Sequence, residues 1–193
     1  MRPVLDDLEQ RLKHTEHVVK DLKQKIDAAE DAWDKKNPNV SDLKVVIDEL
    51  AATLKDYSEI NRGLQAESVL PTYEPRLYGG RGAVQLALGR AYLMLENNAE
   101  AKIRLDNALS QFNHVDKIKP SLLSDLNLGV THFYLGNRSK AREHLRKIMQ
   151  ITKPENPLQE QIIARAAVYW QKLNIPESYA NGASAIAASP SLK

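Results

Sequence analysis

Histidine and cysteine are the residues most often used to bind metals or to move protons, and this chain offers few settings for either. It contains five histidines and no cysteine, so it has no disulfide and no thiolate metal site. His14 and His17 lie three residues apart, a spacing that places both on one face of a helix and lets them share a metal. No third ligand is evident beside them, and the face around them is charged. We therefore expect no bound metal.

The run from Gly79 to Gly82 precedes a predicted helix and is the closest approach of this sequence to a phosphate-binding loop. It lacks the Gly-Lys-Ser/Thr ending of such loops, and no strand precedes it. The sequence also has no nucleophile elbow, no dinucleotide fingerprint and no pair of carboxylates that can be placed in a cleft. We therefore expect a protein that is not an enzyme and that takes no cofactor.

Basic residues gather near position 140, and nucleic-acid binding needs a patch of this kind. The patch consists of Arg138, Lys140, Arg142, Arg146 and Lys147. No recognition helix or set of stacking aromatic residues accompanies it. We expect a solvated helix face and no nucleic-acid partner.

Length and composition are those of a soluble globular protein, with 193 residues, a hydrophobic fraction of 42% and a charged fraction of 27%. No apolar run approaches the roughly 20 residues needed to span a bilayer, and the first residues are too charged for a signal peptide. We expect no membrane span and a cytoplasmic location, although the lack of cysteine fits a periplasm as well. Residues 1–67 carry a net charge of −4 (11 − 15) and the remainder carries +6 (16 − 10).

The first helix expected from hydrophobic spacing covers most of the first 35 residues. Apolar or small residues alternate at spacings of three and four, which is the pattern of a coiled-coil seam. They are Leu5, Leu8, Leu12, Thr15, Val19, Leu22, Ile26, Ala29 and Trp33. Such a helix is about 50 Å long, more than a small domain needs. Its seam either pairs within the chain or extends into self-association.

Pro38 and its neighbouring asparagines predict the end of that helix, and Ser41 is the expected N-cap of a second. The second helix repeats the seam with Leu43, Val46, Leu50, Thr53, Tyr57, Ile60 and Leu64. Matching seams and a short connection predict an antiparallel hairpin over residues 1–67. Residues 68–82 contain two prolines and three glycines, which predict a linker.

An internal repeat follows, because residues 88–109 align with residues 128–149. The matched pairs are Leu88 with Leu128, Gly89 with Gly129, Tyr92 with His132, Leu95 with Leu135, Ala101 with Ala141, Leu105 with Leu145, and Leu109 with Met149. In each copy we expect the glycine to let two helices approach, the alanine to meet it, and the second leucine to fill the space between them. His132 then occupies an aromatic core position, which favours a packed histidine over a catalytic base.

This pattern resembles the tetratricopeptide repeat, which has Leu-Gly, an aromatic residue three positions on and a small residue nine further. The resemblance implies antiparallel helical hairpins stacked in a right-handed solenoid over residues 83–175, with a degenerate helix from about Leu158 to Leu173 as a cap. The copies lie 40 residues apart instead of 34, and Gln85 and Asp125 replace the usual tryptophan. Residues 176–193 lack periodicity and are expected to form a flexible tail.

Tetratricopeptide proteins usually hold their ligands in a concave groove lined by the first helix of each repeat. The resemblance places nine residues in that groove: Leu86, Arg90, Leu93, Met94, Leu123, Leu126, Val130, Phe133 and Tyr134. Most are apolar, which implies a groove for an amphipathic helix and not a clamp for a carboxylate. The chain's own N-terminal helix or tail is the alternative occupant.

These observations predict an all-α adaptor or scaffold that binds a protein or peptide partner and does no chemistry. Two alternatives remain open. One is a structural coiled-coil subunit that forms homo- or hetero-oligomers through its N-terminal helix, and the other is a chaperone-like binder of secretion substrates.

Overall fold

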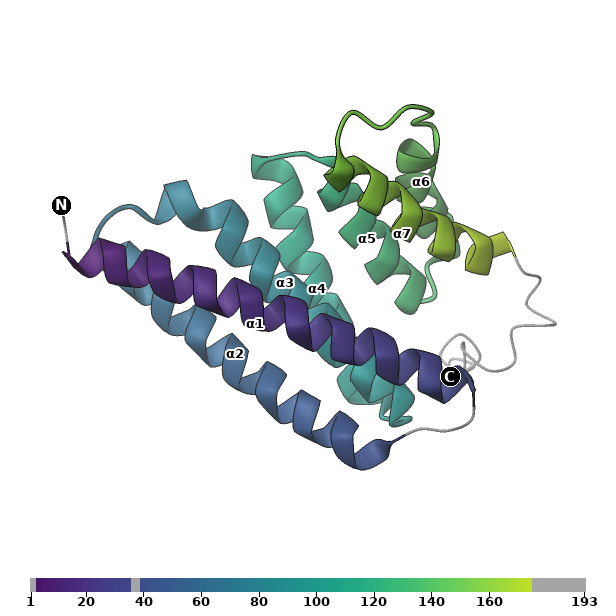
Figure 1. The fold of residues 1–193 in the computed structure, drawn as a ribbon, viewed down its shortest axis with the longest axis horizontal. Helices are drawn as coiled ribbons and strands as arrows, with labels where there is room; N and C mark the ends of the chain where they lie inside the picture. Colours follow the sequence, from purple (N-terminus) through teal and green to yellow (C-terminus); the bar gives the residue numbers. More distant parts are fainter. Residues whose placement is uncertain (1–2, 36–38, 175–193) are drawn as a thin grey trace, which may run out of the picture. The chain divides into compact units, whose positions relative to one another are not determined.

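The computed structural model describes residues 3–35 and 39–174. These described residues form seven α-helices and no strand, which confirms the predicted all-α class (Figure 1). The helices are α1 Pro3–Asp34, α2 Val40–Ala66, α3 Leu70–Met94, α4 Asn98–Ile118, α5 Leu122–Tyr134, α6 Arg138–Met149 and α7 Pro157–Asn174. They divide into two compact units, residues 1–115 and 116–193. The predicted tail, 176–193, lies outside the described residues.

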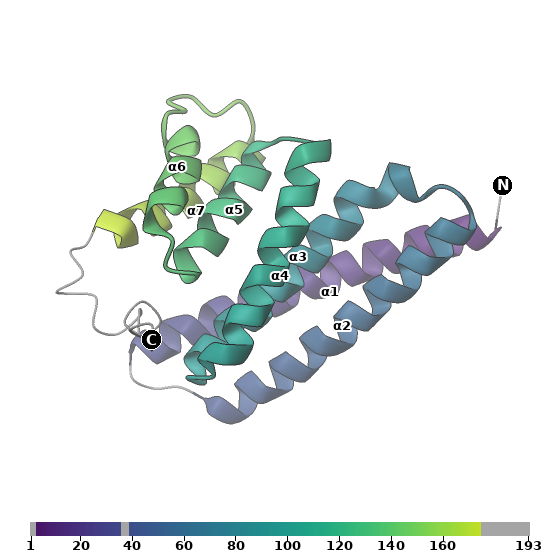
Figure 2. The same ribbon diagram turned by 180° about the vertical axis from the view of Figure 1, so that it is seen from behind.

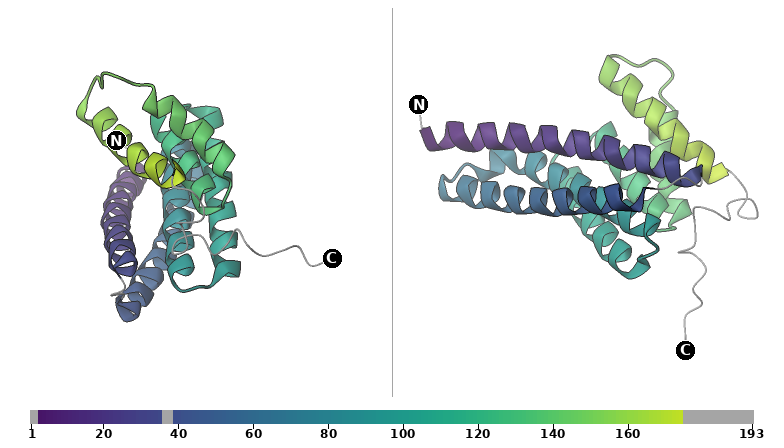
Figure 3. Two further views of the ribbon diagram at one scale, coloured as in Figure 1. Left: turned by 90° about the vertical axis from the view of Figure 1, so that its right-hand side faces the viewer. Right: turned by 60° about the horizontal axis from the view of Figure 1, so that its bottom comes forward.

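The predicted hairpin of α1 and α2 is present in the first unit, and the seam of α1 is buried there. Leu8, Leu12, Val19, Leu22 and Ile26 all belong to one core with residues of α2 and α3. The two helices lie side by side along their length (Figure 3). The long first helix therefore uses its seam within the chain.

Ion pairs show that α1 and α2 run in opposite directions. Arg11 Nη2 lies 3.1 Å from Glu59 Oε2, and Lys25 Nζ lies 2.8 Å from Glu49 Oε2. A step forward along α1 is thus a step backward along α2. The start of α2 differs slightly from the expectation, because Asn39 and not Ser41 is its N-cap. The side chain of Asn39 accepts a hydrogen bond from the backbone N–H of Asp42 at 3.2 Å.

A continuous helix, α3, occupies the segment where the sequence analysis expects a linker. It begins at Leu70 and includes Pro75 and the glycine run. Pro71 lies in the first turn of the helix, where its missing backbone donor would be unpaired anyway, whereas Pro75 lies inside the helix and costs one backbone hydrogen bond. Two of the glycines receive large side chains, since a Cβ on Gly80 would lie 2.1 Å from Tyr57 Oη and one on Gly82 would lie 2.6 Å from Phe112 Cε1. Contacts with other helices therefore outweigh the poor helix propensity of this segment.

The third helix runs parallel to α1, so the first three helices form an up-down-up bundle (Figure 1). Arg76 of α3 makes two hydrogen bonds to the carboxylate of Glu16, at 2.9 and 2.7 Å. Further along both helices, Arg90 contacts Asp27 and Glu30 of α1. The order of these contacts is the same on both helices, which fixes the parallel direction.

The α3–α4 hairpin has the glycine contact that the repeat predicts. A Cβ on Gly89 would lie 2.6 Å from Leu105 Cγ, and both Ala101 and Leu105 are fully buried. Gly82 and Phe112 repeat this contact farther from the turn between α3 and α4. Figure 2 shows the two helices of this hairpin from behind. The second helix of the hairpin extends to Ile118, which accounts for the unusual length of the repeat.

The second unit contains the hairpin of α5 and α6, with α7 packed on both helices. A Cβ on Gly129 would lie 2.9 Å from Leu145 Cγ, and Ala141 and Leu145 are fully buried, as in the first hairpin. The predicted helix near Leu158–Leu173 is present as α7. It buries one face through Ile162, Ala166, Tyr169 and Leu173.

The two hairpins also share the same turn. The backbone N–H of Asn97 donates to the carbonyl of Tyr92, and that of Asn137 donates to His132, each at 2.9 Å. The residue before each asparagine is left-handed, with φ of 57° at Glu96 and 75° at Gly136. The internal repeat is thus a repeat of structure.

None of the helices in the described ranges has the length and apolar character that crossing a bilayer requires.

Candidate protein-binding surface

Four of the nine predicted groove residues lie on α3 in the first unit, and α1 covers part of this region. Arg90 is only 2% exposed, and its Nη2 lies 2.7 Å from both Asp27 Oδ1 and Glu30 Oε2 of α1. Leu86 and Met94 are also buried, while Leu93 is half-buried. The expectation that Arg90 lines an open groove is therefore wrong. At Arg90 the space is taken by α1, the chain's own N-terminal helix, which was the alternative expectation.

The electrostatics of Arg90 explain why α1 and α3 meet at this point. A buried guanidinium is costly unless it is paired and hydrogen-bonded, and two carboxylates here supply the opposite charge. Asp27 and Glu30 are three residues apart on α1, so both reach the same guanidinium from one helix face. This contact joins residues about sixty positions apart, and local spacing gives no sign of it.

The other five predicted groove residues lie along one face of α5 in the second unit. Leu126 and Val130, in the middle of this face, are buried. Leu123 near the N-terminus of α5 is 46% exposed, and Phe133 and Tyr134 near its C-terminus are half-buried. We call these five residues the α5 face. Its two ends offer apolar or aromatic surface, and its centre is used for packing.

An aromatic cluster holds the C-terminal end of the α5 face in place. Phe133 and Tyr134 each make an edge-on contact with Tyr169 of α7, with ring centroids 5.3 and 5.9 Å apart. The hydroxyls of Tyr134 and Tyr169 lie 3.3 Å apart, within hydrogen-bonding distance. Tyr169 is a part of this site that the groove prediction missed. Its place on the apolar face of the capping helix was the available signal.

No protein-family model, curated protein or solved structure gives a significant match to this chain.

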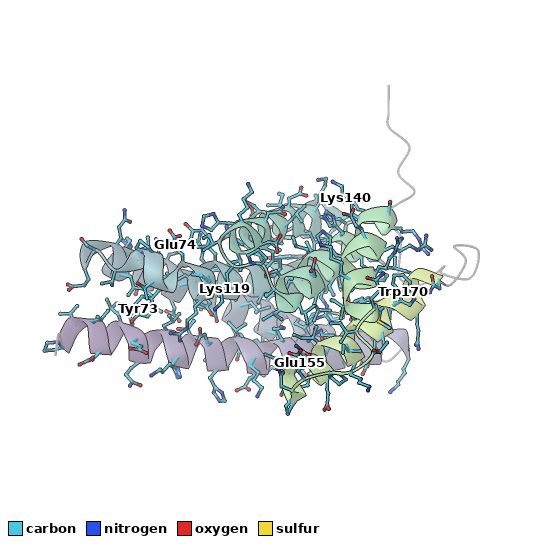
Figure 4. All side chains as sticks on the ribbon, turned by 90° about the horizontal axis from the view of Figure 1, so that it is seen from above. Tyr73, Glu74, Lys119, Lys140, Glu155 and Trp170 are labelled. Carbon is cyan, nitrogen blue, oxygen red and sulfur yellow. The ribbon has the colours of Figure 1, made fainter. Side chains whose placement is uncertain are left out.

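The basic residues of α6 have structural partners that the sequence did not reveal. Arg138 and Arg142 both donate to the backbone carbonyl of Leu173 at the end of α7, at 2.6 and 2.7 Å. Lys147 lies 2.8 Å from Asp125 of α5. Lys140 is exposed on the outside of α6, as Figure 4 shows, and Arg146 is exposed as well. Three of the five basic side chains thus help to hold the three helices of the second unit together.

The histidines singled out for chemistry lie in unlike surroundings. His14 and His17 are exposed on α1, and His17 Nε2 lies 3.5 Å from Asp21 of the same helix. Among the described residues, no group of three or more histidines and carboxylates is arranged to hold a metal ion. His132 is 5% exposed, so it is packed inside the α5–α6 hairpin, as the repeat pattern predicts.

Proposed function

We propose that this protein is a non-enzymatic helical adaptor that binds a segment of another protein at the α5 face. The observation that carries the proposal is the accessible apolar surface at both ends of this face, at Leu123 and at Phe133 with Tyr134. Aromatic side chains on a rigid support are the usual anchors of protein interfaces. An amphipathic helix with apolar residues at both ends of one stripe fits this spacing.

The proposal includes a tetratricopeptide-like character for the two hairpins. Its support is the equivalence of their glycine contacts and turns, with Gly89 and Gly129 each against a buried leucine. The proposal also includes a cytoplasmic location, as expected from the sequence.

We place the alternative of a structural coiled-coil subunit second to the adaptor. That reading needs a free seam on α1, whereas the seam residues from Leu8 to Ile26 are packed within the first unit. A chaperone-like role toward secretion substrates uses the same α5 face as the adaptor and differs from it only in the partner.

The test compares capture of partners by the wild type and by Leu123→Glu from a lysate of the source cells. A charge at an exposed contact residue should weaken binding at least about tenfold, which corresponds to about 1.4 kcal/mol. Proteins recovered by the wild type are identified by mass spectrometry, and their affinities for both variants are measured by calorimetry. Leu123 is exposed, so we expect the thermal unfolding of the variant to match the wild type.

The matched control is Ile103→Glu, which places the same charge at a 54% exposed apolar residue of α4. We expect this variant to bind as the wild type does. Equal binding by all three proteins, or equal loss in Leu123→Glu and Ile103→Glu, would contradict a role for the α5 face.

A further inference from the structure

Two histidine rings stack across the interface of α5 and α6. The ring centroids of His132 on α5 and His144 on α6 are 5.8 Å apart, with an angle of 18° between the ring planes. His132 is buried, and its Nδ1 lies 3.4 Å from the side-chain nitrogen of Asn137 in the turn. An amide N–H donates to this ring nitrogen only while the nitrogen carries no proton. The packing therefore suits a neutral His132.

The carboxylate of Asp125, on the same helix as His132, contacts two side chains of α6. Asp125 Oδ1 lies 2.9 Å from His144 Nδ1 and 2.8 Å from Lys147 Nζ. This carboxylate therefore balances positive charge on α6 and pairs there with His144 and Lys147.

The charges of α6 also disfavour a proton on His132. Burial lowers the pKa of His132 below its usual value, and the neighbouring His144 and Lys140 lower it further. Glu143 has the opposite effect, which is smaller than each of these. The third helix of this unit, α7, brings Tyr169 against α5, with its hydroxyl next to that of Tyr134. Lys172 of α7 lies over the ring of Tyr169.

We propose that the α5–α6 hairpin is an acid-sensitive element, which opens when His132 is protonated while the three-helix bundle of the first unit stays folded. A proton on His132 places a charge inside the interface, removes the acceptor for Asn137 and adds to the positive charge of α6. Opening releases the surface on which α7 packs and separates Phe133 from Tyr169. Mild acid thereby dismantles the α5 face.

Proton linkage gives the direction in which the stability of the hairpin changes with pH. The unfolded hairpin binds a proton on His132 near the ordinary pKa of about 6.5, and the folded hairpin binds it at lower pH. The stability that His132 contributes is therefore complete above about pH 6.5 and is lost as the pH falls through the lower, folded pKa. The first hairpin has a tyrosine, Tyr92, in place of the histidine at the equivalent position, and it supplies an internal reference.

The test is amide hydrogen exchange of the whole protein at pH 7.5 and 5.5, corrected for the intrinsic effect of pH. In the wild type, we expect exchange in residues 122–149 to speed up severalfold relative to residues 82–112, up to a ceiling of about tenfold that is set by an ordinary histidine pKa of about 6.5 in the unfolded state. In His132→Tyr, which copies the residue of the first hairpin, the two regions should keep their ratio within about twofold. His132→Gln, which also does not titrate, replaces this variant if the tyrosine impairs folding.

The control is His17→Gln, which removes an exposed histidine of α1 and should leave the acid response of the hairpin unchanged. No acceleration in the wild type would overturn the proposal. It would equally be overturned if both His132 variants kept the full acid response, because another group would then be responsible.

Discussion

At the scale of single residues, three glycines of α3 have different roles. A Cβ on Gly80 would lie 2.1 Å from the hydroxyl of Tyr57, and one on Gly82 would lie within 2.6 Å of Phe112. Tyr57 is fully buried, and its hydroxyl has no hydrogen-bond partner among the described residues. Burial is also the main reason why the pKa of this hydroxyl lies above its usual value. Gly79, in contrast, has nothing within 4 Å of such a Cβ.

Neighbouring Gly→Ala substitutions should therefore have opposite effects. Gly79→Ala should raise the free energy of unfolding by about 0.5–1 kcal/mol, because alanine is the better helix former and the site has room. Gly80→Ala should lower it by about 1–3 kcal/mol, because the methyl group displaces the buried ring of Tyr57. Chemical denaturation followed by circular dichroism measures both changes. A free energy of unfolding that rises in both variants would show that Gly80 is not a packing position.

At the scale of secondary structure, α1 behaves as a core helix of the first unit. Its seam is buried against α2 and α3, and the ion pairs of Arg11, Arg76 and Arg90 tie it to both helices. The ion pairs of Arg11 and Arg76 are partly exposed and contribute little, and that of Arg90 offsets the cost of burying its charge. Most of the stabilisation therefore comes from the buried seam. The length of α1 is explained by its two partner helices.

A charge in this seam should unfold the first unit and not disperse an assembly. Val19→Glu buries a carboxylate at a residue that is 6% exposed, and should lower the free energy of unfolding by about 3 kcal/mol or more. Gln24→Glu, at an exposed position of the same helix, should change it by less than about 0.5 kcal/mol. Thermal unfolding and light scattering behind a sizing column measure stability and mass together. A wild-type oligomer that becomes a folded monomer in Val19→Glu would restore the coiled-coil subunit.

At the scale of the whole molecule, the boundary between compact units falls after Val115 and not in the predicted linker at 68–82. The first unit has 16 basic and 19 acidic residues, a net charge of −3 (16 − 19), and the second has 11 and 6, a net charge of +5 (11 − 6). The difference in sign between residues 1–67 and the remainder of the sequence thus also holds between the two structural units. The core of α1 and α2 is completed by α3, whose residues Leu77, Val84 and Leu88 are buried in it.

Two fragments of the chain distinguish the boundary after Val115 from the one predicted at 68–82. Residues 1–118, which end with α4, should unfold cooperatively on heating, because they keep the entire core of the first unit. Residues 1–67, the predicted N-terminal domain, should not, because Tyr57, Ile60 and Leu64 lose the helix that buries them. Calorimetry of both fragments measures this difference. A cooperative transition of similar temperature in the shorter fragment would favour the boundary predicted from the sequence.

The sequence by itself determined the features that depend on local spacing. The seams of α1 and α2 are periodic over many residues, so the burial of Leu12, Leu22, Leu50 and Leu64 follows from the spacing. The glycine, alanine and leucine positions of the two hairpins also follow from it, because the two helices of each hairpin are joined by a short turn. Neighbours in such a hairpin are close in the sequence, and one copy of the repeat predicts the other.

Only the tertiary structure decided how distant helices use these surfaces. Pro75 and the glycines near it have poor helix propensity, and the segment is helical because Tyr57 and Phe112 pack against it. Arg90 is buried because Asp27 and Glu30 approach it from a helix some sixty residues earlier. Such contacts produce no periodic pattern in the sequence, because the residues that make them are far apart along the chain and meet only in the folded protein.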